Sequence, residues 1–113
     1  MKSAQEISET LAEPAIETCK HILAQHYGDR LRSVILYGSA ARRELTDSSD
    51  IDLLVLLSQP LDYFKELRII VDLLYPMQLE ANHWISAKPA GFDEFEAGIN
   101  QLYRNVKREG IAL

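Results

Sequence analysis

The chain has 113 residues, of which 47% are apolar and 26% are charged, and its formal charge at pH 7 is −5. This length predicts one domain over residues 1–113, and the acidic balance argues against a general nucleic-acid surface, which needs a basic stripe. A single cysteine, Cys19, excludes an internal disulfide. No stretch has the ~20 apolar residues of a membrane span or the core of a signal peptide, so we expect a soluble, cytoplasmic protein.

The first half of the chain predicts helices, strands and turns in succession. Ser3 and Glu6 form a capping-box pair, which starts a helix near Ala4. A second helical pattern ends at Gly28, and a β-branched and aromatic strand ends at Gly38. We expect this second helix over 14–27, this strand over 32–37, a short helix over 40–45, and an aliphatic strand over 51–57 that is buried on both faces.

The second half predicts helix, strand and helix. Residues 62–74 have helical spacing, and we expect Pro76 to open a new element. Polar residues alternate along 77–86, which predicts a third strand. A last helical stripe runs from Phe92 to Val106. The order α-α-β-α-β-α-β-α predicts a mixed α/β fold, with a small mixed sheet flanked by helices.

Two aspartates lie at the start of the predicted aliphatic strand, where a buried strand does not need charged residues. Asp50 and Asp52 are two residues apart, so in a strand their side chains point to the same side, about 6–7 Å apart. Two like charges in an apolar setting are costly without cations. Converging carboxylates can hold a pair of divalent ions, so we expect both residues to bind metal.

Gly38 and Ser39 lie at a predicted junction between strand and helix. Glycine permits a sharp turn and a close backbone approach, while serine can cap the helix that follows. The first amides of such a helix favour a phosphate, and Arg42 could reach a triphosphate from its first turn. These three residues are therefore candidates for nucleotide binding, although Gly-Ser by itself is a common turn pair.

Together these residues resemble the nucleotidyltransferase superfamily that includes DNA polymerase β, whose signature is Gly-Ser, ten residues, then Asp-x-Asp. Gly38-Ser39 and Asp50-Ile51-Asp52 have this spacing, and GSAARRELTDSSDIDLLVLL and the closing LYRNVKREGIAL are similar to the minimal nucleotidyltransferases, or MNT proteins. The resemblance covers the chain from about Tyr27 onward. It implies the polymerase β-like fold, ATP as substrate, two Mg²⁺ ions at the aspartates, and the β- and γ-phosphates at the Gly-Ser pair.

The chain departs from this family in two places. Arg43 stands where the family often has glycine. The third carboxylate of the superfamily, usually an aspartate on a neighbouring strand, is best matched by Glu80. We expect Glu80 to complete the metal site as a third catalytic residue and to help take the proton of the acceptor hydroxyl. Glutamate is one methylene longer, which leaves its reach to the metals open. Asp72 is the other candidate, but its helical pattern places it on a solvated face.

The resemblance also implies a partner. MNT proteins are usually encoded beside a HEPN-domain ribonuclease toxin, which they silence as antitoxins by adenylylating a tyrosine. We therefore expect Mg²⁺-dependent AMP transfer from ATP to a hydroxyl of such a partner, in a hetero-oligomer and without direct contact to nucleic acid or membrane. Two alternatives stay open. One is a catalytically weak antitoxin that masks its partner, and the other is a catalytic subunit that modifies a small molecule such as an aminoglycoside.

Overall fold

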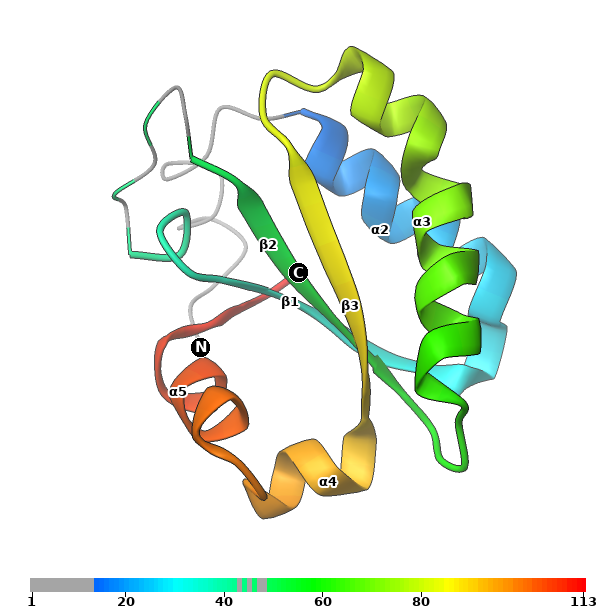
Figure 1. Ribbon diagram of the computed structural model, residues 1–113, viewed down its shortest axis with the longest axis vertical. Coiled ribbons are helices and arrows are strands. Elements are labelled where there is room, and N and C mark those ends of the chain that lie inside the picture. Colours follow the sequence, from blue (N-terminus) through cyan, green and yellow to red (C-terminus); the bar gives the residue numbers. More distant parts are fainter. Residues whose placement is uncertain (1–13, 43, 45, 47–48) are drawn as a thin grey trace.

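The computed structural model describes residues 14–42, 44, 46 and 49–113, and Figure 1 labels its main elements. The described elements in chain order are α2 (Ala15–Tyr27), the 3₁₀ turn η1 (Gly28–Arg30), β1 (Leu31–Tyr37), β2 (Ile51–Leu57), α3 (Tyr63–Glu80), β3 (Ile85–Gly91), α4 (Phe92–Ala97), α5 (Gln101–Glu109) and β4 (Ile111–Ala112). The helix predicted from Ala4 lies outside these residues. Within them, no helix has both the length and the apolar character that a membrane crossing requires.

The strands form a four-stranded mixed sheet in the order β3-β2-β1-β4. β1 is antiparallel to both β2 and β4, whereas β2 and β3 are parallel. β2 has a strand on each side, and its residues are buried except for Asp52, which is half-buried. This confirms the predicted mixed α/β fold and the predicted strand over 51–57.

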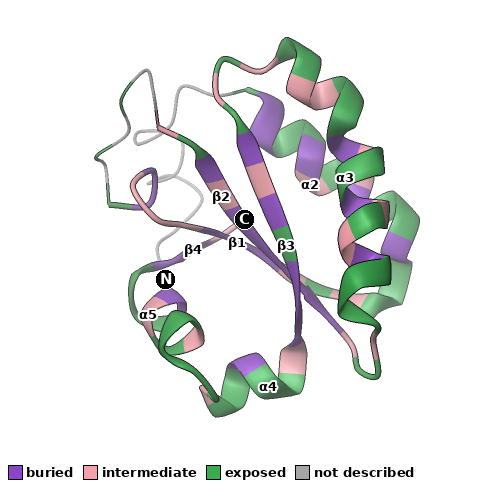
Figure 2. Ribbon diagram, viewed as in Figure 1, coloured by how far each residue is buried: buried purple, intermediate pink, exposed green. Residues whose placement is uncertain are grey.

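The helices cover the two faces of the sheet separately (Figure 1). Leu53 and Val55 of β2 belong to the larger core, which includes α2 and α3, while Leu54 and Leu56 belong to a smaller core with α4 and α5. Figure 2 shows the buried positions gathered on the strands and on the sides of the helices that face them. Because side chains alternate along a strand, Asp52 lies on the same face as Leu54, the face that α4 and α5 cover at its other end.

Helix α3 is longer than the sequence predicts. It continues through Pro76 to Glu80, so the predicted strand over 77–86 is wrong. Leu74 and Met77 extend one apolar stripe at helical spacing and pack against the larger core. This packing outweighs the hydrogen bond that Pro76 cannot make, because tertiary contacts routinely override local propensity.

Two strands differ from the prediction or were not predicted. β3 lies at 85–91. Its sequence does not predict a strand clearly, because Pro89 and Gly91 are residue types that are uncommon inside strands. β4 is only two residues long and follows Gly110; it pairs with β1 through Ile111 and Ala112. Such a short strand has no sequence signal of its own, because its partner selects it.

The last predicted helix is divided in two. Gly98 has a φ of +61° and ends α4, and the side chain of Asn100 accepts a hydrogen bond of 2.8 Å from the Tyr103 amide at the start of α5. The break takes Ile99 and Leu102 out of the predicted apolar stripe, and both side chains are exposed.

Candidate active site

The end of β1 and the start of β2 bring the Gly38 turn against Asp52. Tyr37, the last residue of β1, pairs in register with Asp52. Gly38 follows with a φ of +75°, in the left-handed region that favours glycine. A β-carbon at position 38 would lie 2.5 Å from Oδ2 of Asp52. The missing side chain at Gly38 is therefore what lets the backbone of the turn approach this carboxylate.

The residues after Gly38 form a hydrogen-bonded turn. The amide of Arg42 donates to the carbonyl of Gly38 at 3.2 Å, and the amide of Glu44 donates to the carbonyl of Ser39 at 2.8 Å. The described part of 40–45 is thus a turn and not the regular helix predicted, while two of its positions lie outside the described residues. Ser39 is half-buried at the start of this turn.

Asp50 and Asp52 influence one another electrostatically. Asp50 is exposed just before β2, and Asp52 is half-buried within it. Burial and then the charge of Asp50 raise the pKa of Asp52, whereas the positive charges of Lys88 and Arg42 lower that pKa. A bound cation would remove the repulsion between the carboxylates, because it favours the charged form of both.

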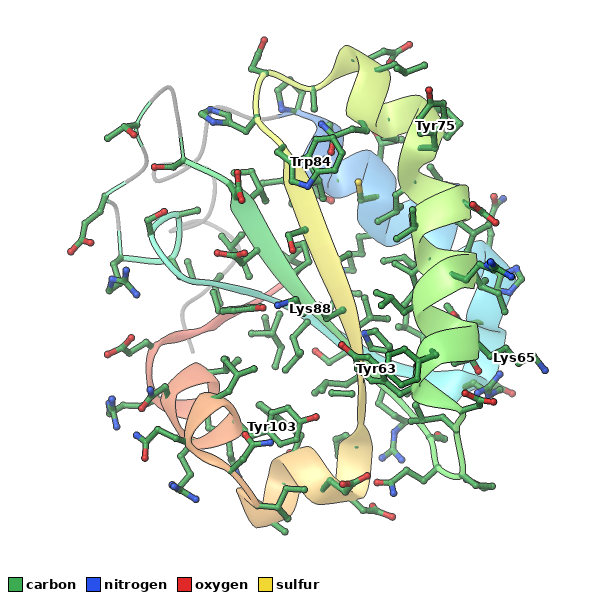
Figure 3. The ribbon with its side chains drawn as sticks, in the orientation of Figure 1. Tyr63, Lys65, Tyr75, Trp84, Lys88 and Tyr103 are labelled. Carbon is green, nitrogen blue, oxygen red and sulfur yellow. The ribbon has the colours of Figure 1, made fainter. Side chains whose placement is uncertain are left out.

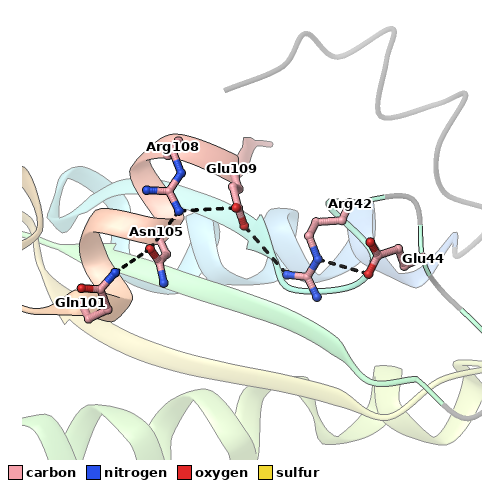
Figure 4. A network of polar contacts seen from close by, with 6 residues as sticks. All are labelled: Arg42, Glu44, Gln101, Asn105, Arg108 and Glu109. Atoms are coloured by element: carbon pink, nitrogen blue, oxygen red, sulfur yellow. Dashed lines mark hydrogen bonds and ion pairs between the residues drawn. The ribbon is translucent and has the colours of Figure 1, made fainter.

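Arg42 connects the turn to helix α5 (Figure 4). Its Nε is 3.2 Å from Oε2 of Glu44, and its Nη1 is 3.9 Å from Oε2 of Glu109. Glu109 in turn lies 3.5 Å from Nη2 of Arg108, which also donates to Asn105. Exposed ion pairs of this kind contribute little free energy, so a triphosphate can compete for the Arg42 guanidinium.

Residues 83 and 84, just before β3, form hydrogen bonds to both chain neighbours of Asp50. The amide of Ile51 donates to the carbonyl of Trp84 at 2.7 Å, and Nδ1 of His83 lies 3.0 Å from the carbonyl of Ser49. Both chain neighbours of Asp50 are therefore fixed to residues 83 and 84. The aspartate stands on a constrained backbone although its side chain is exposed.

β3 places Ser86 and Lys88 on the side of Asp52 away from the Gly38 turn. Ser86 pairs with Asp52 in register, and Lys88 lies two residues further along the same face. Lys88 is exposed, and its charge lowers the pKa of Asp52. Sequence reasoning missed both residues because it placed the third strand too early. The alternation within 85–91 was the signal that could have found them.

Glu80 does not occupy the predicted position. It is the last residue of α3 and is exposed, so the argument that placed it on a strand beside Asp52 is wrong. Ser86 takes the register position next to Asp52. Asp72 is also exposed on α3. Among the residues that the structure describes, no three carboxylate, histidine or cysteine side chains gather as a metal cluster. The carboxylate that lies against Gly38 is thus Asp52, and the charge of Asp50 acts on it.

Comparisons with known proteins give a matching family and a similar protein. Residues 17–87 match the family described as "Polymerase beta, Nucleotidyltransferase". Over 102 residues the chain is 33% identical to a protein of Methanocaldococcus jannaschii that carries the name "Putative protein adenylyltransferase MJ0604". That alignment covers 89% of this chain and 96% of the relative. The family match includes the Gly38 turn, both aspartates and Ser86.

Proposed function

The chain belongs to the polymerase β nucleotidyltransferase family as one of its minimal members, and we propose that it transfers AMP from ATP, with Mg²⁺, to a hydroxyl of a partner protein. The observation that carries this proposal is the contact between the Gly38 turn and Asp52. Gly38, which has no side chain, lies directly against the carboxylate of Asp52, and the charge of Asp50 acts on that carboxylate. In this proposal the turn binds phosphate and the carboxylates bind metal, so the two ligands would lie next to one another.

The donor set fits magnesium. Mg²⁺ is commonly held by one or two carboxylates together with substrate phosphates and water, so Asp50 and Asp52 suffice without a third protein ligand. Burial and then the charge of Asp50 raise the pKa of Asp52 despite the opposing charges of Lys88 and Arg42, and a bound cation would favour its charged form. When bound, the metal would supply charge neutralisation on the phosphates.

The other residues of the site orient the nucleotide. The amides of the Gly38-Ser39 turn bind the β- and γ-phosphates, and Arg42 exchanges its exposed carboxylate partners for phosphate oxygens. β2 holds Asp52 rigidly, because the strand is buried and has a neighbour on each side. The protein therefore contributes mainly position and charge, which are the dominant requirements of phosphoryl-group chemistry.

The acceptor in this proposal is a HEPN-domain toxin, modified on a tyrosine, with which the chain forms a hetero-oligomer as antitoxin. The name of the M. jannaschii relative supports a protein acceptor. The HEPN partner follows from the likeness to the MNT proteins.

A second candidate function is an antitoxin that masks its partner by binding and transfers AMP only weakly. Ser86 favours it, because the residue that pairs with Asp52 on the neighbouring strand is a serine and not a carboxylate. A serine hydroxyl is neither a charged metal ligand nor an effective base near neutral pH.

Labelled ATP separates these functions. The chain is incubated with ATP labelled on the α-phosphate and Mg²⁺, with and without the neighbouring HEPN-domain protein, and Asp52→Asn serves as the matched control. We expect label on the partner only, dependent on Mg²⁺ and lost in Asp52→Asn. Inhibition of the partner without label would support the antitoxin that acts by binding alone. Label on a small molecule would support a catalytic subunit that modifies small molecules.

A further inference from the structure

The segment 81–84, which connects α3 to β3, is held by the side chain of Gln78. Nε2 of Gln78 donates to the carbonyl of His83 at 3.0 Å, and Oε1 of Gln78 accepts the amide of Ile85 at 2.6 Å. One side-chain amide therefore bonds to the backbone on both sides of Trp84. Figure 3 shows Trp84 where the chain enters β3, with Lys88 further along the strand. Gln78 thus fixes the end of this segment to the last turn of α3.

His83 extends this attachment to the residue before Asp50. Its Nδ1 lies 3.0 Å from the carbonyl oxygen of Ser49. A carbonyl oxygen can only accept a hydrogen bond, so Nδ1 must carry the hydrogen, and the neutral ring is then unprotonated at Nε2. On the other side of Asp50, the bond from the Ile51 amide to the Trp84 carbonyl joins backbone atoms. The bond from His83 is therefore the one that a substitution can remove.

Ser49 also bonds to Thr46. The amide of Ser49 donates to the carbonyl of Thr46 at 3.1 Å, and the hydroxyl oxygen of Ser49 accepts the amide of Thr46 at 3.0 Å. These two bonds use the amide and the side chain of Ser49, whereas the bond from His83 uses its carbonyl. That carbonyl belongs to the peptide group that joins Ser49 to Asp50. Loss of the His83 bond would let this peptide group rotate and would move the carboxylate of Asp50.

The position of Asp50 matters because a metal ligand must be held in place. Asp50 is exposed, so its side chain is not fixed by packing, whereas Asp52 is half-buried inside β2. Ordering a loose carboxylate around an ion costs conformational entropy, and a backbone that is already fixed lowers this cost. Groups that orient the ligands of a metal typically change its affinity roughly 10–100-fold.

We propose that His83 is a positioning residue for Asp50 and that Gln78 acts through it, so that the end of α3 sets how tightly the site binds its divalent ion. This inference rests on the proposed function, in which Asp50 and Asp52 hold Mg²⁺. In this role His83 acts through the carbonyl of Ser49 and not on the nucleotide itself. Its loss should therefore lower the affinity for metal.

The tautomer of His83 provides a test that needs no metal. In the full chain labelled with ¹⁵N-histidine, ¹H–¹⁵N correlation spectra show which ring nitrogen carries the hydrogen, and at about pH 8 an ordinary histidine is neutral. The chain has three histidines, so His83→Asn identifies the resonances of His83 by their disappearance. We expect the Nδ1–H form for His83. The Nε2–H form would overturn the proposal.

Metal affinity should distinguish His83→Phe from His83→Asn. Phenylalanine keeps a ring but has no donor, whereas asparagine carries an amide donor at the same δ position as Nδ1. Mn²⁺ alone, which suits the same oxygen ligands as Mg²⁺, is titrated into each full chain, and the free ion is measured by electron paramagnetic resonance. We expect His83→Phe to bind Mn²⁺ about tenfold more weakly than the wild type, and His83→Asn to bind it within about twofold. His21→Phe is the matched control, because His21 is exposed on α2, and it should bind Mn²⁺ as the wild type does.

The Asp50→Asn background shows whether His83 acts through Asp50. There His83→Phe should add no further loss of Mn²⁺ affinity, because the ligand that it positions is already changed. Gln78→Met keeps the length of the side chain but removes both hydrogen bonds, so it should weaken Mn²⁺ binding in the same direction. An equal loss from His83→Phe in both backgrounds would overturn the proposal, as would a His83→Asn chain that binds as weakly as His83→Phe.

The outcomes separate this inference from the proposed function. AMP transfer to the partner, with Mn²⁺ affinity unchanged in His83→Phe, would overturn the positioning role and leave the transfer intact. The expected affinities in a chain that transfers no AMP would support the positioning role and overturn the transfer chemistry. A wild-type chain that binds no Mn²⁺ would overturn the metal assignment and this inference with it.

Discussion

Replacing Gly38 with alanine tests the contact on which the proposed active site depends. The backbone at φ +75° costs an L-residue roughly 1–2 kcal/mol. The new β-carbon also lies 2.5 Å from Oδ2 of Asp52, so this carboxylate must swing out of its preferred rotamer at roughly 0.5–1.5 kcal/mol. The two costs together amount to about 1.5–3.5 kcal/mol, which lowers the Tm of a domain of this size by roughly 6–14 °C.

Gly28→Ala is the matched control for this substitution. Gly28 has a φ of +56°, and nothing lies within 4 Å of a β-carbon added there. It therefore carries the backbone cost alone, with a Tm decrease of roughly 4–8 °C. Thermal unfolding by circular dichroism measures both decreases, and calorimetric titration measures the affinity for ATP with Mg²⁺. We expect Gly28→Ala to bind ATP like the wild type, and Gly38→Ala to bind about tenfold or more weakly because its carboxylate is displaced.

The Asp52→Ala background isolates the clash itself. There only the β-carbon of residue 52 remains, 3.6 Å from the added β-carbon, which is an ordinary contact. Adding Gly38→Ala to this background should lower stability no more than Gly28→Ala does. An equal stability loss from Gly38→Ala in both backgrounds would refute the carboxylate contact, and ATP affinity unchanged in Gly38→Ala would refute the phosphate-binding turn.

Three further substitutions test the electrostatics of the site. Asp52→Asn removes a charged metal ligand at nearly constant shape, so the single-turnover rate of transfer should fall about a hundredfold or more. The Tm should stay level or rise, because the repulsion from Asp50 is lost. Undiminished Mg²⁺-dependent transfer would contradict the metal assignment. Glu80→Gln lies at the exposed end of α3 and should transfer at the wild-type rate, whereas a tenfold loss in the same assay would return Glu80 to the site. Burial and then the charge of Asp52 raise the pKa of Tyr37 to about 12. Unfolded tyrosine ionises near pH 10, so the folded chain loses stability as pH rises from there towards 12. The free energy of unfolding, measured by urea titration, should therefore fall less in Tyr37→Phe than in the wild type between pH 9 and 11. An equal fall in both proteins would contradict the raised pKa of Tyr37.

The sequence by itself determined the part of the site whose geometry is local. Two consecutive strands carry these residues at their ends: Gly38 and Ser39 follow the first, and the two aspartates lie at the start of the second. The aliphatic sequence of residues 51–57 predicts a buried strand. The turn needs glycine for its φ, and two carboxylates so close along the chain repel one another. Both features are written in residue type and spacing, so the family and the fold class could be predicted, while the roles of these residues stay predictions.

Only the tertiary structure decided what stands beside Asp52 on its other side. Pro76 has the local character of a helix breaker, yet the apolar stripe of α3 finds the core and carries the helix to Glu80. β3 is a strand because β2 offers it a parallel partner, although Pro89 weakens its own propensity. Register, which depends on contacts between segments distant in the chain, then places Ser86 next to Asp52, while Glu80 ends helix α3 and is not on a strand.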